Sequence, residues 1–351
     1  MPHRLFPFVF DLYHLPYPHC WQGANAGRMD RVVTRRPARQ DMMMNAVALI
    51  SMAQDEAAFA KAFGESFERY GFAMVKDHDL DADLVARAWT AAQEFFAQGT
   101  DAKMRYDARD IGGARGYTPY GTEIAKDAKY VDQKEFWHVG RDLPDDHPLK
   151  PSTPGNIWPD YPEDFRAVFE TLYAQFDRTG AKLLRAIAIY LGLDPEFFER
   201  SSREGNSVLR LLHYPPVDEN APGIRAEAHG DINLITMLLG AEEAGLEIID
   251  KSGEWLPVSP PPGGLAVNVG DMLERLTNNR LPSTIHRVRN PDEGRKGHAR
   301  YSMPFFMHLP SDFPIETLES CVDAEHPNLY PEPLLADDFL QQRLREIGLK
   351  K

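Results

Sequence analysis

The second half of this 351-residue sequence consists of short apolar segments that are separated by turns. Each segment is shorter than an average helix, and clusters of glycine, proline and polar residues, as at 250–253, divide one segment from the next. The predicted strands cover residues 207–214, 232–239, 245–250, 264–269, 283–289 and 300–309. A series of short strands of this kind is typical of a double-sheet jelly roll.

The first half of the chain has helical patterns instead. A predicted strand at 46–50 is followed by a helix at 55–70, whose apolar residues recur at intervals of three and four. Gly71 ends this helix, as glycine commonly does at a helix C-terminus. A second strand and a second helix are predicted at 72–75 and 81–98.

The middle of the chain completes the predicted architecture. Residues 107–143 are glycine-rich and are expected to be irregular, whereas 163–190 form a long helix or helix pair that backs the sheet. A short helix begins near Pro195. The fold class is therefore α+β, with a double-stranded β-helix (jelly-roll) core and flanking N-terminal and backing helices.

The domain organisation follows from a change in composition. Residues 1–43 mix aromatic residues, prolines and arginines without a period, so we expect a disordered extension; an arginine-rich targeting peptide is the alternative. Residues 44–351 are predicted to form a single domain. It comprises an N-terminal α/β segment at 44–150, the jelly-roll core at 200–310 and a C-terminal helical segment at 311–351.

Composition excludes several classes of partner. The 39 Lys and Arg residues against 53 Asp and Glu residues give a net charge of −14, which argues against a nucleic-acid-binding surface. No apolar run is long enough to span a membrane. Cys20 and Cys321 are too few for a disulfide framework, so a cytoplasmic protein is expected. We expect a monomer or weak homodimer that binds a small molecule.

The segment His229-Gly230-Asp231 is a candidate metal site. In an extended segment, residues i and i+2 point to the same side, about 7 Å apart along the chain. In the predicted strand around His286, alternation places Thr284, His286 and Val288 on one face. Two histidines and one carboxylate leave open positions on a six-coordinate metal, an arrangement diagnostic of non-haem Fe(II) oxygenases.

The context of these residues matters, because a His-x-Asp pair also occurs by chance and the chain has 12 histidines. An apolar segment that ends in Gly270-Asp271 precedes His286, and Arg300-Tyr301-Ser302 follows it. The order His-x-Asp, His, Arg-x-Ser resembles the isopenicillin N synthase-like branch of the 2-oxoglutarate/Fe(II)-dependent dioxygenases. The resemblance extends from about residue 46 to the C-terminus.

This resemblance implies a non-haem Fe(II), 2-oxoglutarate-dependent oxygenase. Such an enzyme oxidises a small molecule by hydroxylation, desaturation or cyclisation, and it releases succinate and CO2 from its co-substrate 2-oxoglutarate as O2 is consumed. His229, Asp231 and His286 would be the catalytic metal ligands. The substrate and the reaction outcome stay open, since one scaffold supports several reactions.

The resemblance also implies a co-substrate site. Arg300 would bind the distal carboxylate of 2-oxoglutarate, because a guanidinium presents a planar fork that a carboxylate accepts in bidentate fashion. Ser302 lies at i+2 and shares that face. Tyr214, which precedes two prolines, matches the tyrosine that commonly contacts the co-substrate. Leu212 stands where plant members usually carry asparagine, which removes one possible polar contact.

Substrate contacts are expected from the irregular region, since loops often carry binding residues. The candidates are Arg115, Tyr117 and Lys134; ordinary charge pairing or core packing is the alternative for this region. Four further residues are expected to be structural: His78, Arg287, His298 and His308. Three apolar residues are candidates either for the pocket or for the core: Met237, Leu246 and Phe306.

Two other functions fit the same residues. An Fe(II) oxidase that resembles isopenicillin N synthase would use the same iron ligands without 2-oxoglutarate, and succinate formation would separate it from an oxygenase. A non-catalytic jelly-roll binding protein is the third class. The intact set of His229, Asp231 and His286 argues against that class.

Overall fold

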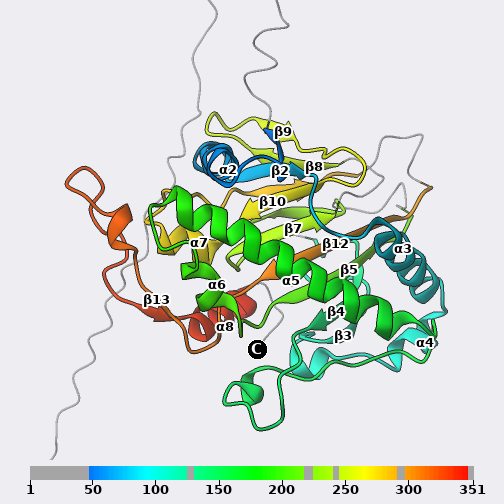
Figure 1. The fold of residues 1–351 in the computed structure, drawn as a ribbon. Helices are drawn as coiled ribbons and strands as arrows, with labels where there is room; N and C mark the ends of the chain where they lie inside the picture. Colours follow the sequence, from blue (N-terminus) through cyan, green and yellow to red (C-terminus); the bar gives the residue numbers. More distant parts are fainter. Residues whose placement is uncertain (1–46, 125–129, 217–223, 240–244, 291–296, 347–351) are drawn as a thin grey trace, which may run out of the picture. The chain divides into compact units, whose positions relative to one another are not determined.

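Two β-sheets lie at the centre of the computed structural model, which describes residues 47–124, 130–216, 224–239, 245–290 and 297–346 (Figure 1). The larger sheet has eight strands among these residues. In spatial order they are β1 (Leu49–Ser51), β2 (Phe72–Lys76), β10 (Leu265–Val269), β7 (Ile235–Leu239), β12 (Arg300–Met307), β5 (Val208–Tyr214), β4 (Glu135–Gly140) and β3 (Gly116–Thr118).

The smaller sheet supplies the second layer. Its strands, in spatial order, are β6 (Ala226–His229), β11 (His286–Val288), β8 (Leu246–Ile249) and β9 (Trp255–Pro257). Nearly all neighbouring strands in the two sheets are antiparallel, and only β1 and β2 are parallel. This mixture of helices with a large antiparallel sheet confirms the predicted α+β jelly-roll class.

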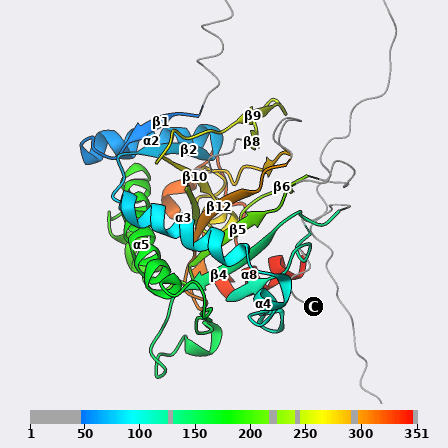
Figure 2. The same ribbon diagram turned by 90° about the vertical axis from the view of Figure 1, so that its right-hand side faces the viewer.

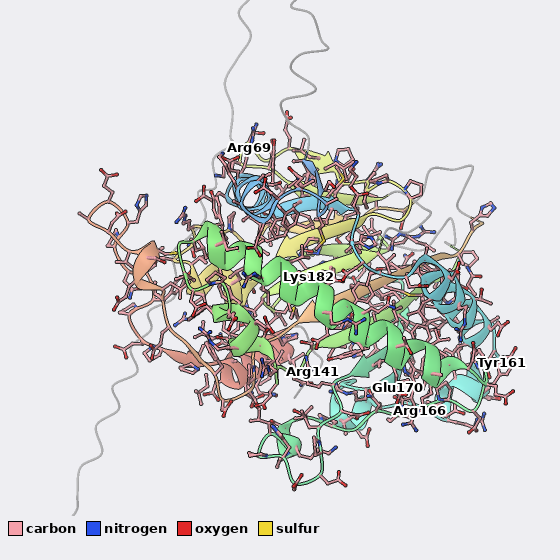
Figure 3. All side chains as sticks on the ribbon, in the orientation of Figure 1. Arg69, Arg141, Tyr161, Arg166, Glu170 and Lys182 are labelled. Carbon is pink, nitrogen blue, oxygen red and sulfur yellow. The ribbon has the colours of Figure 1, made fainter. Side chains whose placement is uncertain are left out.

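Three helices cover one face of the larger sheet. They are α2 (Glu56–Tyr70), α3 (Ala82–Phe96) and α5 (Phe165–Tyr190), and they lie on the side of the larger sheet away from the smaller sheet (Figure 2). The outer surface of α5 is charged and carries Arg166, Glu170 and Lys182 (Figure 3). The shorter helices are α4 (Thr100–Met104), α6 (Phe197–Ser202), α7 (Asp271–Leu276) and α8 (Ala336–Glu346).

Local sequence determines both ends of α2, and the glycine at its C-terminal end was predicted. The Asp55 carboxylate accepts hydrogen bonds from the backbone N–H groups of Ala57 and Ala58, both at 3.1 Å. At the other end, Gly71 adopts a left-handed conformation with φ 63°. Its N–H donates to the carbonyl of Phe67 at 2.8 Å, which closes the helix.

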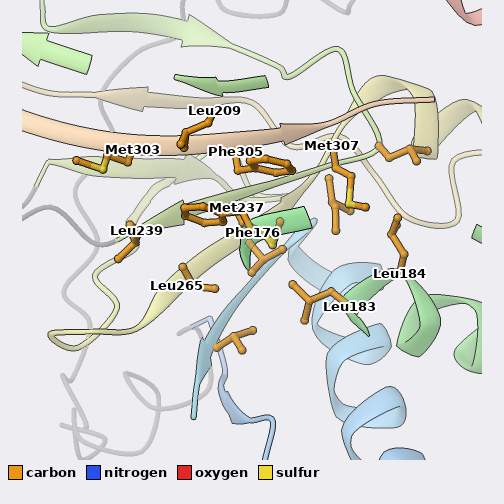
Figure 4. Close-up of a cluster of buried hydrophobic side chains, with 14 of the residues drawn as sticks. Phe176, Leu183, Leu184, Leu209, Met237, Leu239, Leu265, Met303, Phe305 and Met307 are labelled. Atoms are coloured by element: carbon orange, nitrogen blue, oxygen red, sulfur yellow. The ribbon is translucent and has the colours of Figure 1, made fainter. Parts of the chain in front are cut away.

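Alternation along the strands gives the larger sheet two different faces. Side chains such as Met237, Leu265 and Phe305 point towards the helices and form a continuous apolar core (Figure 4). The ring of Phe305 stacks on that of Phe176 from α5, with centroids 5.3 Å apart. On each of these strands, the residues at the alternate positions point towards the smaller sheet. We call these two sides the helix face and the cavity face.

Two predictions about the strands were wrong. Residues 107–143 are not irregular throughout, because they contain β3 and β4. Every residue of β4 is buried, so its sequence lacks the apolar–polar alternation that identifies a half-exposed strand. The strand predicted at 232–239 begins only at Ile235, and residues 230–234 cross from the smaller to the larger sheet.

The chain separates into two units, Met1–Met43 and Met44–Lys351, and the described residues all belong to the second. The extension that was predicted for residues 1–43 lies outside the described residues. The predicted C-terminal helical segment contains α8, and it also contains a two-stranded sheet of β13 (Pro314–Ile315) and β14 (Leu334–Leu335). No helix in the described part of the chain is long and apolar enough to cross a membrane.

Candidate metal centre

The three predicted metal ligands converge at the edge of the smaller sheet. His229 ends β6 and His286 begins β11, and the two residues are direct partners across these antiparallel strands. Their ring centroids lie 4.4 Å apart, and His286 Nε2 lies 3.8 Å from Asp231 Oδ1. One nitrogen or oxygen from each of the three side chains lies within 4.8 Å of the other two.

The route by which Asp231 reaches this cluster differs from the prediction. His229 and Asp231 do not share one extended strand, because β6 ends at His229 and the chain then turns towards β7. The backbone of this turn is held by α7, where the N–H of Asp271 donates to the carbonyl of Asp231 at 2.7 Å. A turn rather than strand alternation therefore aims the carboxylate at the two histidines.

Hydrogen bonds orient both imidazoles. The Nδ1 atom of His229 lies 2.7 Å from the carbonyl oxygen of Glu227, and that of His286 lies 3.2 Å from the carbonyl oxygen of Thr284. A carbonyl oxygen only accepts, so Nδ1 carries the proton in each ring and Nε2 keeps its lone pair. Phe72 packs edge-on against His286, with centroids 5.5 Å apart.

The carboxylate of Asp231 is held in the same way. Its Oδ2 atom accepts from Thr236 Oγ1 at 2.5 Å and from Asn268 Nδ2 at 2.7 Å, which leaves Oδ1 directed at His286. Sequence analysis missed these two supporting residues. The available signal was the presence of a hydroxyl and an amide in the otherwise apolar segments that became β7 and β10.

The charge state of the cluster suits a divalent metal. Burial, together with the neighbouring His286, lowers the pKa of His229 to about 4, so its imidazole is neutral at neutral pH. Burial alone would raise the pKa of Asp231, but the two histidines and the hydrogen bonds outweigh burial and lower it. Two imidazoles that each hold their Nδ1 proton towards a carbonyl, together with one carboxylate, form a donor set that fits Fe(II).

The predicted co-substrate residues lie together on the cavity face. Arg300 and Tyr214 are direct partners across β12 and β5, and the Arg300 guanidinium lies 5.1 Å from the centre of the Tyr214 ring. Arg300 Nη1 donates to Ser302 Oγ at 3.2 Å, and both side chains are buried. A buried guanidinium with an adjacent hydroxyl provides donors that a carboxylate can accept.

A cavity connects the metal cluster with Arg300. Its lining comprises Phe72, Lys134, Arg210, Leu212, Tyr214, Ala226, His229, Asp231, Thr236, Leu238, Leu246, Asn268, His286, Val288, Arg300, Ser302, Pro304 and Phe306. Two of the three apolar candidates, Leu246 and Phe306, therefore line the cavity. Met237 lies on the helix face instead and belongs to the core.

Of the three predicted substrate contacts, only Lys134 lines the cavity. Tyr117 pairs with Trp137 on the helix face, where its hydroxyl donates to Glu135. Arg115 is fully buried outside the cavity and donates to Asn206 Oδ1 at 2.9 Å. The register of β3 against β4 turns Tyr117 towards the helices, and Arg115 lies just before β3, so the structure gives no geometric support for a substrate contact by Arg115 or Tyr117.

None of the four residues that were expected to be structural lines the cavity. Arg287 follows His286 on the opposite face of β11, where it pairs with Glu247 at 2.9 Å. The ring of His78 lies 2.6 Å from the carbonyl oxygen of Gly263. His298 and His308 are not among the residues that line the cavity.

Comparisons with known proteins agree with this geometry. Residues 46–161 match the family model for the N-terminal region of the non-haem dioxygenases of morphine synthesis, and residues 205–309 match the 2OG-Fe(II) oxygenase superfamily. The 2-oxoglutarate-Fe(II) type oxidoreductase hxnY of Emericella nidulans is 32% identical over 297 residues, which are 82% of this chain and 84% of the relative.

Solved structures give the same result. A 2OG-Fe(II) oxygenase family protein from Caulobacter crescentus is 53% identical, with a TM-score of 0.80 over 86% of this chain and 99% of the other. A full-length Neurospora crassa protein, solved in complex with alpha-KG and thymine, is 26% identical, with a TM-score of 0.76 over 85% of this chain and 96% of the other.

The chain therefore belongs to the 2OG-Fe(II) oxygenase superfamily. It is an oxidoreductase that uses Fe(II), O2 and 2-oxoglutarate to oxidise a small molecule, as the sequence predicted. The alternative of an oxidase that works without 2-oxoglutarate is not favoured, because the relative hxnY is a 2-oxoglutarate-Fe(II) type oxidoreductase and the full-length Neurospora protein was solved in complex with alpha-KG.

Proposed function

We propose that His229, Asp231 and His286 bind the catalytic Fe(II) of this oxygenase. The observation that supports the proposal is that each of the three side chains uses one polar atom to bond the protein and directs another at the other two side chains. Both histidine Nδ1 atoms and Asp231 Oδ2 are engaged by the protein, while the two Nε2 atoms and Oδ1 face one another. Hydrogen bonds of this kind orient ligands and tune their basicity before a metal binds.

Arg300 and Ser302 bind the distal carboxylate of 2-oxoglutarate, and the ring of Tyr214 packs beside them. When bound, the iron and 2-oxoglutarate supply the oxidising power, with succinate and CO2 as the co-products of substrate oxidation. The residues of the chain hold the co-substrate in place and exclude water. Apolar side chains such as Phe72, Leu238 and Leu246 provide the dry wall of the cavity.

The substrate is a small cyclic molecule. The Neurospora relative was solved with thymine, and a clavatol oxidase of Penicillium crustosum is 33% identical over 71% of this chain. The enzyme acts in the cytoplasm as a monomer or weak homodimer and does not bind nucleic acid. Its two cysteines and its net charge of −14 support these assignments.

An anaerobic titration tests the proposed function. The Fe(II)-loaded enzyme is titrated with 2-oxoglutarate while the metal-to-ligand charge-transfer absorbance is followed, and succinate is then measured in air with candidate substrates. We expect a saturable absorbance band in the wild type and none in the His229→Ala or His286→Ala variants. A wild-type enzyme without a band at any concentration would refute the proposed site.

A further inference from the structure

A charged cluster lines the cavity wall formed by β4 and β5, outside the metal and co-substrate residues. Lys134 Nζ lies 2.8 Å from the carboxylate of Glu123 and 2.7 Å from that of Asp132. Glu123 also pairs with Arg210 at 3.1 Å, and Arg210 Nε donates to His138 Nε2 at 2.6 Å. Glu123, Asp132, Lys134 and His138 are buried, the side chain of Arg210 is 15% exposed, and Lys134 and Arg210 line the cavity.

This wall cluster of Glu123, Asp132, Lys134, His138 and Arg210 is electrically balanced. Burial acts to lower the pKa of Lys134, but Glu123 and Asp132 outweigh burial and raise it. Burial acts to raise the pKa of Glu123, but Arg210 and Lys134 outweigh burial and lower it. Burial, with Arg210 nearby, lowers the pKa of His138 well below its ordinary value, so His138 is neutral. Two cations therefore face two anions.

The cluster nevertheless keeps a hydrogen-bond donor for a ligand. An ammonium has three N–H groups, and the described contacts of Lys134 use two of them. Lys103, buried on the helix face, differs: its ammonium bonds both Glu135 oxygens, at 2.8 and 2.9 Å, and the carbonyl of Phe96 at 3.2 Å. Lys103 is saturated and belongs to the core, whereas Lys134 faces the cavity with one donor remaining.

The proposed metal side of the cavity leaves no positive charge for an anionic substrate. The two charges of Fe(II) and that of Arg300 are matched by Asp231 and the two carboxylates of 2-oxoglutarate. The remaining cations that line the cavity within the described residues are Lys134 and Arg210, which Glu123 and Asp132 already neutralise. A buried carboxylate on the substrate would have no partner, and an unpaired buried charge is strongly unfavourable.

We infer that the primary substrate is an uncharged compound whose carbonyl oxygen accepts a hydrogen bond from Lys134, which makes Lys134 a specificity-determining residue. The apolar body of the compound contacts Phe306 and the aliphatic wall. Phe306 is held for this contact by the Arg210 guanidinium, 5.2 Å from its ring centre. This inference depends on the proposed function for the positions of iron and 2-oxoglutarate.

The test compares matched compounds on the anaerobic Fe(II)–2-oxoglutarate enzyme by calorimetric titration. The pairs are thymine with orotate, its carboxylate-bearing ring analogue, and acetophenone with benzoate. We expect the uncharged member of at least one pair to bind, and to bind at least about tenfold more tightly than its carboxylate partner. The inference is overturned if a carboxylate binds as tightly, or if neither uncharged compound binds.

A variant tests the residue itself. Lys134→Met keeps an unbranched side chain that is one atom shorter and removes the donor, so the uncharged compound should bind about tenfold more weakly or worse. The control is Lys182→Met, since Lys182 pairs with Asp79 on the exposed surface of α5 (Figure 3) and its loss should leave binding unchanged. Unchanged binding by a folded Lys134→Met enzyme contradicts the role of Lys134.

The two proposals fail in different ways. If the charge-transfer band is missing, the proposed metal and co-substrate site is wrong. If the band forms normally but uncharged compounds show no preference over carboxylates, the site stands and the inference about the substrate is wrong. The matched compounds on the wild-type enzyme decide this question even if Lys134→Met does not fold.

Discussion

The two faces of the larger sheet differ although the same strands build both. Along β12, Met303, Phe305 and Met307 point into the apolar core beneath α5. The alternate residues Arg300, Ser302 and Phe306 line the cavity. A shift of one residue along the strand therefore separates side chains that stabilise the fold from side chains that bind ligands.

Buried charge follows the same division. On the helix face, the Glu135 carboxylate accepts hydrogen bonds from Lys103, Tyr117 and His213. The buried charges on this face are therefore paired within the protein. Around the cavity, the metal ligands of the smaller sheet and its following turn keep atoms directed at one another, and the described contacts of Lys134 use two of its three N–H groups. Satisfied polar groups specify packing, whereas partly satisfied ones at a cavity indicate a site for a ligand.

The largest effect is expected at the metal. Asp231→Ala removes one of three ligands, so the variant should lose iron affinity by more than about 100-fold, beyond the typical loss for a supporting residue. It should still fold, because the helix-face core is untouched. Iron is measured after dialysis, with Asp250→Ala in an exposed turn as the control. Iron content equal to that of the wild type would contradict the assignment.

Adjacent residues of β12 give the next test. Phe305→Ala leaves a cavity in the core against Phe176 and should cost about 3–5 kcal/mol of the free energy of unfolding. Phe306→Ala, on the half-buried cavity side, should cost about 1 kcal/mol. Urea unfolding of both variants measures the difference. Equal losses would show that the two faces do not divide stability from binding as we describe.

A third test concerns the co-substrate. Truncating one partner of a buried charge pair costs about 2–5 kcal/mol, so Arg300→Ala should weaken 2-oxoglutarate binding roughly 30- to several-thousand-fold. Arg300→Lys should recover part of the loss, and Ser302→Ala should lose roughly tenfold. Tyr301→Phe is the control, because Tyr301 stacks on His213 on the helix face. The affinity of all four variants for 2-oxoglutarate is measured by the anaerobic charge-transfer titration.

The sequence predicted the metal ligands, but it did not predict the residues that orient them by hydrogen bonds. His229, Asp231 and His286 form a motif that can be recognised from residue type and order. The face on which a residue lies depends on strand register, which the sequence does not reveal where both faces are buried. This is why Tyr117 was expected in the pocket although it lies on the helix face.

The supports of the metal ligands were missed for a related reason. Thr236 and Asn268 lie far apart in the chain, and only the pairing of β7 with β10 brings both to the same carboxylate oxygen. Their polar side chains interrupt apolar segments, which was a usable signal. A buried polar residue in such a segment needs a partner, but the sequence could not say which one.

The smallest expected effect is at these supporting residues. Asn268→Ala and Thr236→Val each remove one hydrogen bond to Asp231 Oδ2 and should weaken iron binding by about 10- to 100-fold, less than Asp231→Ala. Thr236→Val keeps the shape of the side chain, so its effect isolates the lost hydroxyl. Thr171→Val is the matched control, since Thr171 bonds only the carbonyl of Ala167 on the exposed side of α5. Competition with a metal chelator measures each affinity. If Asn268→Ala and Thr236→Val both bind iron as tightly as the wild type, the orientation of Asp231 is set by the turn and α7 alone, and the cavity face of the larger sheet does not contribute to iron binding.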